Sequence, residues 1–336
     1  MKKSFTKPED VLFNDLVSLF ESGVELAPWR KPWDASKGSG SHRNLITGQE
    51  YSGANPMLLE IYSAMRGQTI PLWIGSAQAK KIGCHPVKGC KSARILRPQL
   101  NQYEKTDDQG KPVVNDNGEA EMNIWTSYKI ACVFNIADIK GKDEASQKKL
   151  DSLIKSEINN QTPVNQNEVI ERAEAVLKAW PVKTTYGGSV ACYSPQADVI
   201  ACPSLESFES SLAFYATLAH EQAHSTGHKS RLNRPMEGRF GSASYAREEL
   251  VAELASILIG CRLQIGCDIQ NHASYLKNWA SKLREDGAKS LLKAISEARR
   301  AADLITGETT VEETAEAAPK PAEAPMVASP YAVFRR

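Results

Sequence analysis

The sequence predicts an α+β protein, in which an N-terminal α+β region is followed by a mostly helical region with a small sheet. Two observations support this prediction. Segments between residues 92 and 139 favour strands, whereas from residue 207 onward apolar positions recur at the helical period. A chain of 336 residues is also long enough to form two domains.

The N-terminal region is expected to hold three helices and two strands. The first helix has apolar residues at helical spacing and ends at Gly23, and the third is capped by Ser76 and ends at Gly83. Turn signals in DDQGK and NDNGE predict an exposed hairpin or loop over 103–122. The expected helices span 8–23, 55–67 and 76–83, and the expected strands span 92–100 and 123–139.

The C-terminal region is expected to be mostly helical. TTYGGSVACYSPQADVIACP predicts two short strands joined by a turn at SPQAD. Past Gly307 the sequence is rich in Glu, Ala and Pro and lacks the apolar residues that a core needs, which predicts disorder. The expected helices span 166–179, 207–225, 245–260, 269–285 and 287–305. We therefore expect domains at 1–140 and 166–306, a partly helical linker at 141–165, and a tail at 307–336.

The composition is typical of a soluble protein, with 41% hydrophobic and 24% charged residues. No stretch resembles a signal peptide or a membrane span, and seven cysteines without a framework spacing suggest reduced thiols, so we expect a cytoplasmic protein. The net charge of +1 hides an uneven distribution. Residues 26–100 contain eleven Lys and Arg against three acids, a local charge of +8, which indicates an acidic partner for this block.

The stretch HEQAH, at residues 220–224, matches the HExxH pattern of zinc metallopeptidases. On a helix His220 and His224 share one face, so both can bind one Zn²⁺ ion. Glu221 is then placed to act as a general base on water rather than as a ligand. Apolar residues on the preceding turns make a core helix the better interpretation than a surface helix with polar histidines.

A catalytic zinc site needs a third protein ligand. His228 lies only four residues past His224, and Gly227 turns the chain away before it, so His228 is the weaker of two possibilities. Glu249 is the better one, because it begins an E-x-x-A-E pattern that places Glu253 on the same helix face. Glu253 is then expected to accept the second ring N–H of a ligating histidine. Glu248 is expected about 100° away on that helix, facing solvent or Arg247.

Two stretches, TLAHEQAHSTGHKSRLNR and FGSASYAREELVAELAS, closely resemble the zincin-like metallopeptidase domain of ArdC-type antirestriction proteins. The N-terminal stretches APWRKPW, HRNLITGQEYSGANPMLL, LWIGSAQAKKIG and VKGCKS resemble the single-stranded DNA-binding domain of the same family, which also occurs fused to plasmid primases. The resemblance covers about residues 8–306. Gln222 and Ser225 depart from it, because the family more often has Leu and an aromatic residue there.

The resemblance implies a protein of plasmids or phages that binds single-stranded DNA and protects incoming DNA from host restriction during transfer such as conjugation. Proteins that bind single strands combine basic groups with aromatic side chains on which bases stack. The residues expected to contact DNA are Trp29, Arg30, Lys31, Trp33, Arg43, Asn44, Tyr51, Lys80 and Lys81. The alternative is that the tryptophans belong to the core and the lysines to a solvated face.

Three functional classes stay open from the sequence. The first is a zinc hydrolase addressed by DNA, whose substrates are host proteins bound to that DNA. The second is a DNA-coating protein with a structural or vestigial zinc site, and the intact Glu221 argues against this. The third is a general peptidase whose basic half binds another acidic partner. Whether the chain is an enzyme is therefore a question for an activity measurement.

Overall fold

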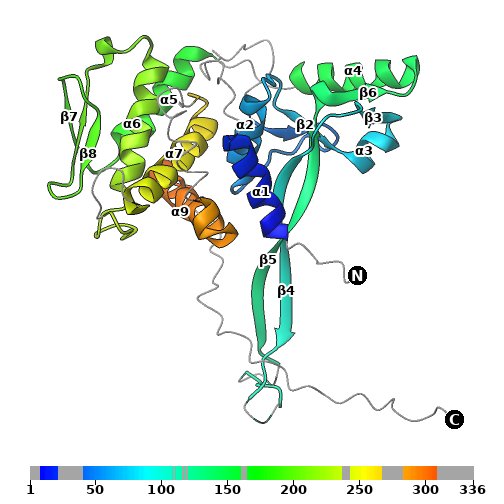
Figure 1. Cartoon of the computed structure of the whole chain (residues 1–336), viewed down its shortest axis with the longest axis horizontal. Coiled ribbons are helices and arrows are strands. Elements are labelled where there is room, and N and C mark those ends of the chain that lie inside the picture. The colour runs from blue at the N-terminus through cyan, green and yellow to red at the C-terminus, as the bar shows by residue number, and fades with distance from the viewer. Residues whose placement is uncertain are drawn as a thin grey trace. The chain divides into compact units, whose positions relative to one another are not determined.

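A computed structural model describes residues 8–21, 41–159 (except 108, 110, 116, 117 and 119), 165–236, 243–266 and 283–308. Its contacts divide into two units (Figure 1). One unit holds the residues up to Arg97 and Lys129–Thr310, and the other includes Pro98–Tyr128. The predicted tail, the loop that contains the first two tryptophans, and most of the helix expected over 269–285 lie outside the described residues.

The N-terminal part is an α+β arrangement, as the sequence predicts. Its larger sheet has the strand order β1-β2-β5-β4, with β1 parallel to β2 and β2 antiparallel to β5, and β3 pairs with β6 in a second sheet. The two long strands correspond to the predicted ones. The four short strands were not predicted, because two to four residues are too few for an alternating pattern. The elements are α1 (Pro8–Glu21), β1 (Arg43–Asn44), α2 (Asn55–Met65), β2 (Leu72–Gly75), α3 (Ser76–Lys81), β3 (Cys84–Pro86), β4 (Ala93–Glu104), β5 (Met122–Asn135) and β6 (Ile139–Gly141).

The stretch expected to be a linker holds a regular helix, α4 (Glu144–Asn159). The Asp143 carboxylate accepts a hydrogen bond from the Ser146 backbone N–H at 2.8 Å and so caps its first turn. Leu150 is buried in a small core that also includes residues of β2, β3 and α3. At Gly141 a Cβ atom would lie 2.4 Å from the Gln147 nitrogen, so only glycine permits this close approach.

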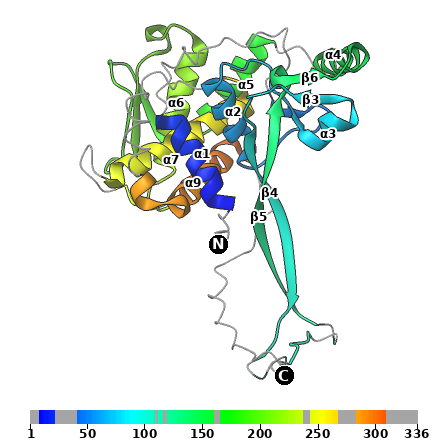
Figure 2. The ribbon, with the colours of Figure 1, turned by 45° about the vertical axis from the view of Figure 1, so that its right-hand side comes forward.

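The C-terminal part packs helices on a small sheet (Figure 2). Its strand order is β7-β9-β8, with β7 parallel and β8 antiparallel to β9. The predicted turn at SPQAD joins β8 to β9, but the first predicted strand is divided, because Gly187 and Gly188 take positive φ values of 120° and 76°. The elements are α5 (Gln166–Lys178), β7 (Lys183–Tyr186), β8 (Cys192–Ser194), β9 (Val199–Cys202), α6 (Ser211–Ser225), α7 (Ala243–Leu263) and α9 (Ala288–Thr306).

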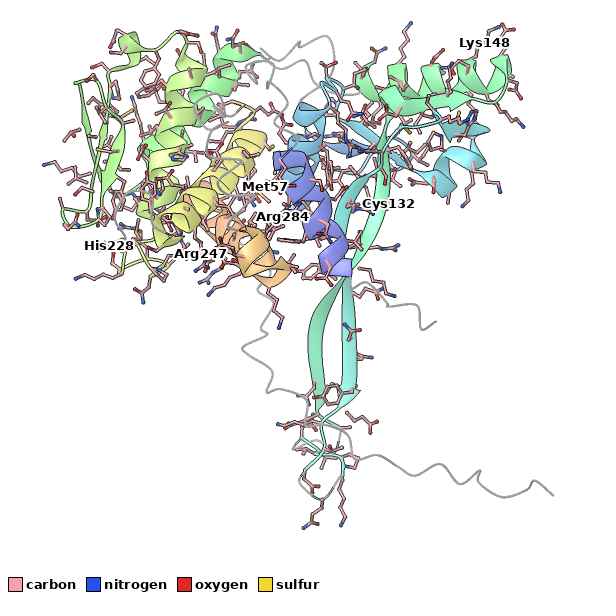
Figure 3. The ribbon with its side chains drawn as sticks, in the orientation of Figure 1. Met57, Cys132, Lys148, His228, Arg247 and Arg284 are labelled. Carbon is pink, nitrogen blue, oxygen red and sulfur yellow. The ribbon has the colours of Figure 1, made fainter. Side chains whose placement is uncertain are left out.

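One hydrophobic core joins the N-terminal and C-terminal parts. Helix α2 packs on α7, and α1 packs on α9. Met57 of α2 and Leu258 of α7 are both buried in this core. Arg284 also donates two hydrogen bonds to Glu21 at the end of α1, and Figure 3 labels Met57 and Arg284. The helix that carries the predicted third ligand therefore packs directly on the N-terminal part.

Two departures from the family pattern have a packing explanation. Gln222 donates a hydrogen bond from Nε2 to the Leu177 carbonyl at 2.7 Å, and Ser225 Oγ accepts one from the Trp180 indole N–H at 2.8 Å. Both residues thus attach α6 to the end of α5 by polar contacts rather than by apolar side chains. Among the helices of the described ranges, none combines the length and the apolar character that crossing a bilayer requires.

Candidate functional site

Helix α6 holds the HEQAH stretch in the core. The Ser210 side chain accepts a hydrogen bond from the Ala213 N–H at 3.2 Å, which caps the helix four residues later than predicted. Leu218 and Ala219 are fully buried, so the two histidines that follow are held on a packed element rather than on a surface helix. The helix ends at Ser225, and Thr226 is its C-cap residue.

His220, His224 and Glu249 lie together between α6 and α7. The two histidine Nε2 atoms are 3.1 Å apart. The Glu249 carboxylate lies 3.6 Å from His224 Nε2 and 3.8 Å from His220 Nε2. Ligand atoms around a tetrahedral Zn²⁺ ion are separated by about 3.3 Å, given metal–ligand bonds of about 2.0 Å. The three predicted ligands thus have nearly the spacing of a tetrahedral metal site.

The outer nitrogen of each histidine faces a carboxylate on α7. His220 Nδ1 lies 3.3 Å from Glu253 Oε2, which is the position expected of Glu253. His224 Nδ1 is hydrogen-bonded to Glu248 Oε1, also at 3.3 Å. The expectation that Glu248 faces solvent or Arg247 is wrong, since Glu248 is only 8% exposed. Helix α7 crosses α6 so that two of its faces, not one, contact the histidines.

Arg234 holds Glu248 in place. It donates from Nε and Nη2 to the two oxygens of Glu248, at 2.9 and 2.6 Å. It also donates to the Thr226 hydroxyl at 2.7 Å and to the Ala223 carbonyl at 2.9 Å, so it joins the end of α6 to α7. A Cβ atom at Gly227 would lie 3.0 Å from Arg234 Nη2 and 2.8 Å from the Met236 sulfur. A side chain at position 227 would therefore crowd Arg234 where the arginine passes the helix end.

Sequence reasoning missed Arg234, although it lies within the stretch that resembles the family. Its separation of fourteen residues from Glu248 matches no helical or strand period, so no local pattern relates the two. The signal that could have pointed to it is the pair of adjacent acids at the start of a core helix, since a buried carboxylate needs a partner.

Among the residues that the structure describes, the carboxylates of the site outnumber the cationic side chains that pair with them. Four buried or nearly buried carboxylates surround the two histidines, and Arg234 is the cation that pairs with one of them. Burial lowers the pKa of His224, but hydrogen bonds to Glu248 and Glu249 outweigh it and raise this pKa to about 10. Burial raises the pKa of Glu249, yet His224 holds it at about 2. The four carboxylates are Glu221, Glu248, Glu249 and Glu253.

These observations fit a divalent metal ion. Two imidazole nitrogens and a carboxylate oxygen are a donor set that zinc enzymes use, and buried charges in proteins are paired or bind metals. A dication would compensate the surplus of negative charge, and the Nδ1 partners would keep both Nε2 lone pairs directed at it.

Glu221 is buried beside the cluster without belonging to the three-ligand set, and it is 8% exposed. Burial and, to a smaller extent, the negative charge of Glu221 raise the pKa of the Cys202 thiol to about 11. Cys202, at the end of β9, therefore stays a thiol and is no competing thiolate ligand. Glu221 thus lies where α6 meets the small sheet.

His228 lies outside the three-ligand cluster. Its Nδ1 is 2.7 Å from the Ser230 hydroxyl and 3.8 Å from Asp198. Asp198 is itself bound by Arg231, whose hydrogen bonds lower its pKa. Figure 3 labels His228 in the segment that follows α6. The structure therefore places His228 with the turn between β8 and β9, not with the two histidines of α6.

The residues expected to contact DNA have different surroundings. Arg43 pairs with Glu50 and lies 3.7 Å from Glu157, so two carboxylates surround its charge. The Asn44 side chain bonds Gln78 at 3.0 Å and the Tyr51 hydroxyl at 3.4 Å. Lys80 and Lys81 are exposed on the last turn of α3. Trp29, Arg30, Lys31 and Trp33 lie outside the described residues.

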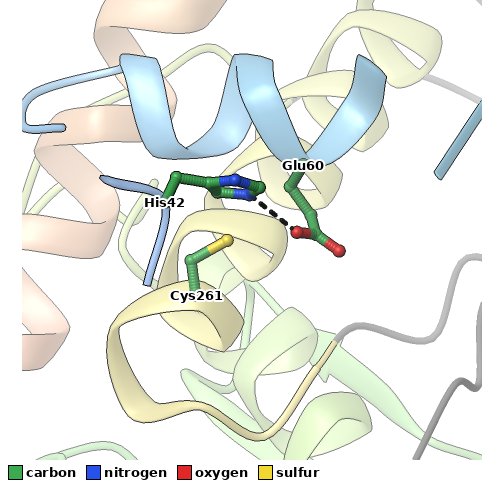
Figure 4. A group of neighbouring side chains, drawn as sticks. All are labelled: His42, Glu60 and Cys261. Atoms are coloured by element: carbon green, nitrogen blue, oxygen red, sulfur yellow. Dashed lines mark hydrogen bonds and ion pairs between the residues drawn. The ribbon is translucent and has the colours of Figure 1, made fainter. Parts of the chain in front are cut away.

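A second group of potential metal ligands consists of His42, Glu60 and Cys261 (Figure 4). The Trp73 indole N–H donates to His42 Nδ1 at 2.9 Å, so in the neutral ring the proton lies on Nε2. That N–H points at Glu60 Oε2, 2.9 Å away. A metal bound at Nε2 would displace this proton. The proton could not move to Nδ1, because Nδ1 already accepts the hydrogen bond from Trp73. We therefore interpret this group as a hydrogen-bonded junction between the N-terminal part and α7.

Two protein families match the chain, one for each part. Residues 8–134 match the N-terminal domain of anti-restriction factor ArdC, and residues 171–297 match a zincin-like metallopeptidase family. Among solved structures, the metal-free antirestriction ArdC protein of plasmid R388 has a TM-score of 0.57 and 27% identity, over 89% of this chain and 97% of that one. Its Mn(II)-bound structure has a TM-score of 0.55 and 26% identity, over 90% and 98%.

Curated relatives include two Escherichia coli proteins described as DNA primase TraC. They are 32% and 33% identical over 90% and 86% of this chain, which spans only 20% and 26% of their lengths. The protein y4eC of Sinorhizobium fredii is 28% identical over 87% of this chain and 89% of its own length. The similarity to the primases thus concerns one segment of much longer proteins.

Proposed function

The chain belongs to the ArdC-type family of antirestriction proteins, and from this we propose that it binds single-stranded DNA, protects incoming DNA from host restriction and is a zinc-dependent peptidase. The observation that carries the peptidase part is the convergence of His220, His224 and Glu249 beside an intact Glu221. A metal that served only the fold would have no use for a general base at that position. We place this activity in the cytoplasm of a cell that receives a mobile element.

His220, His224 and Glu249 would hold the metal. When bound, Zn²⁺ supplies Lewis-acid chemistry towards a peptide carbonyl and makes a water molecule more acidic. Glu221 takes a proton from the attacking water and passes it to the leaving amine, the two-way role of a general acid–base. Glu248 and Glu253 orient the two histidines through their Nδ1 atoms, and Arg234 keeps Glu248 from turning away.

Binding of single-stranded DNA is proposed from the match of the N-terminal part to the family and from its local charge of +8 over residues 26–100. The exposed Lys80 and Lys81 are available for phosphates. Arg43 and Asn44 instead shape the turn between β1 and α2, so their substitution should affect folding as well as DNA binding. The proposed peptidase substrates are host proteins bound to the same DNA.

The test compares wild type with Glu221→Gln, both loaded with Zn²⁺ and, separately, with Mn²⁺. Glu206→Gln, an exposed Glu ahead of α6, is the matched control. Self-cleavage and cleavage of a bacterial single-strand-binding protein are measured with and without an oligonucleotide. We expect Glu221→Gln to keep the metal and to lose activity by about 10²–10⁴-fold, the usual contribution of a general acid–base.

Equal cleavage by wild type and Glu221→Gln would refute the peptidase mechanism. If neither protein cleaves in any arm while both bind the oligonucleotide, the chain is a DNA-coating protein with a non-catalytic metal. Stimulation of cleavage by single-stranded DNA, but not by duplex, would join the two parts of the chain into one DNA-addressed peptidase.

A further inference from the structure

A pocket of about 480 Å³ lies beside the C-terminal end of α2, in the N-terminal part. It is formed by the segment after α2, the turn between β3 and β4, and residues 137–138. We propose that this pocket binds a phosphate group of single-stranded DNA, an inference that rests on the proposed function and gives it a site. The residues that carry the argument are Arg66, Gly67, Gly89, Cys90, Lys91 and Asp138.

Arg66 supplies the first argument. Its guanidinium donates to the Lys91 carbonyl at 2.7 Å and to the Ser92 carbonyl at 3.1 Å, so it is held in place by neutral acceptors. Within the described part of the chain, no carboxylate forms an ion pair with it. Asp15 and Asp138 act on its charge from a distance, but a partly buried guanidinium without a direct ion pair still favours an anion nearby, because its hydration has been lost in part. Its remaining N–H groups have the fork geometry that suits phosphate oxygens.

Lys91 and the two glycines make the pocket accessible to such an anion. Lys91 is exposed at the pocket, and its side chain has no ion-pair partner among the described residues. Gly67 and Gly89 have positive φ values of 64° and 91°, and nothing lies within 4 Å of where their Cβ atoms would be. A ligand can therefore approach the backbone at both turns without a side chain in its way.

Asp138 is the acid among the lining residues, and it opposes an anion. Its carboxylate accepts a hydrogen bond from Gln68 Nε2 at 2.7 Å, which disperses part of its charge. With Arg66 and Lys91 the pocket keeps a net positive charge. Nearby basic residues add to this positive charge. Lys88 is exposed on the same turn, and helix α3, which carries Lys80 and Lys81, packs on β3. Several exposed cations on neighbouring elements suit a strand of phosphates better than an isolated anion.

Cys90 makes the proposal testable without any substitution. It lines the pocket and is partly exposed, whereas Cys192, in β8, is exposed in the other part of the chain. Alkylation with iodoacetamide is followed peptide by peptide, with and without an oligothymidylate of about 15 nucleotides, near the upper end of typical site sizes. With DNA at ten times its dissociation constant, we expect Cys90 to react about tenfold more slowly and Cys192 at an unchanged rate.

Two substitutions with opposite signs test the charge argument. Lys91→Glu should weaken binding of the oligonucleotide by about tenfold and reduce the slope of log K against log salt by about 0.7, one lost phosphate contact on a single strand. Asp138→Asn should strengthen binding. Lys183→Glu, an exposed lysine of β7, makes the same charge change at a distant place in the sequence and should have no more than a small effect.

Thymidine monophosphate and inorganic phosphate distinguish the possible sources of the phosphate group. Unchanged Cys90 reactivity while the oligonucleotide is bound, or a Lys91→Glu effect no larger than that of Lys183→Glu, would overturn the proposal. Protection of Cys90 by the monophosphate but not by the oligonucleotide would assign the pocket to a free nucleotide, which also overturns it.

The proposed binding of single-stranded DNA can be refuted independently of the phosphate pocket. If wild type does not bind single strands in anisotropy measurements, the DNA function fails. Protection of Cys90 by inorganic phosphate then decides whether the pocket binds phosphate at all, and its absence would remove that assignment too.

Discussion

Two clusters of similar donors, one between α6 and α7 and one where α7 meets the N-terminal part, are built for different purposes. In the first, His220 and His224 have Nδ1 atoms that face carboxylates. In the second, the Nδ1 atom of His42 accepts a hydrogen bond from the Trp73 indole N–H. A carboxylate at Nδ1 holds an imidazole proton there and leaves Nε2 directed at the other candidate ligands, whereas an N–H donor at Nδ1 forces the proton onto Nε2.

The comparison teaches that three potential ligands within reach of one another do not make a metal site. What decides is the partner of the histidine nitrogen that faces away from the ligands. In the first cluster these partners leave a site that fits a cation, and in the second they close a chain of hydrogen bonds from Trp73 to Glu60. Substitutions at the two clusters should therefore have different consequences.

The largest expected difference is in metal content. Wild type and His42→Ala should each retain about one Zn²⁺ per chain after dialysis, and His224→Ala should retain almost none, because a zinc site needs three protein ligands. Metal content measured by mass spectrometry on folded protein checks this. If His42→Ala and His224→Ala lose metal equally, the distinction between the clusters is wrong.

Arg234→Met should lower the free energy of unfolding by about 3–5 kcal/mol in metal-free protein, since it leaves the buried Glu248 without its partner. Arg247→Met is the matched control, because Arg247 pairs with Glu297 at 2.7 Å on a more exposed surface, between α7 and α9 (Figure 3). That substitution should cost about 0–1 kcal/mol. Urea denaturation measures both, and similar losses would contradict the role given to Arg234.

Glu248→Gln and Glu253→Gln should each weaken Zn²⁺ binding by about 10–100-fold, the usual effect of removing an outer partner of a metal ligand. Glu297→Gln, on α9, provides the control for an acid-to-amide change away from the histidines. Competition with a chelator of known affinity gives the values. A normal affinity in Glu248→Gln would mean that Arg234 and Glu248 serve the fold alone.

The smallest effect is expected at the second cluster, where a weak gain of metal binding would test the role of the histidine tautomer. Trp73→Phe removes the donor to His42 Nδ1, so the imidazole proton can move there and free Nε2. At high Co²⁺ concentration this variant should develop weak thiolate-to-metal absorption from Cys261, which is absent in wild type. The double variant Trp73→Phe/Cys261→Ser should lack it. Absorption of equal strength in wild type would show that the tautomer does not control this cluster.

Local patterns in the sequence were sufficient to predict the longer helices and to single out the three candidate ligands that the structure brings together. Core-packed helices of period 3.6 and the spacing of four between His220 and His224 are properties of single elements, so they can be recognised without the fold. The short strands were missed because their pairing partners lie far along the chain. The expected linker was predicted to be only partly helical, because the burial of helix α4 depends on a small core formed by other elements.

The sequence by itself determined the α+β class, the resemblance to the family and the residues proposed to bind a metal, because each follows from neighbours on one helix or from a contiguous motif. Only the tertiary structure decided which nitrogen of each histidine faces the other candidate ligands, and that Glu248, held by Arg234, contacts His224. It also decided that Glu50 and Glu157 surround the charge of Arg43. These outcomes depend on how elements cross and on which buried charges meet, and a protein satisfies such charges through contacts between distant residues.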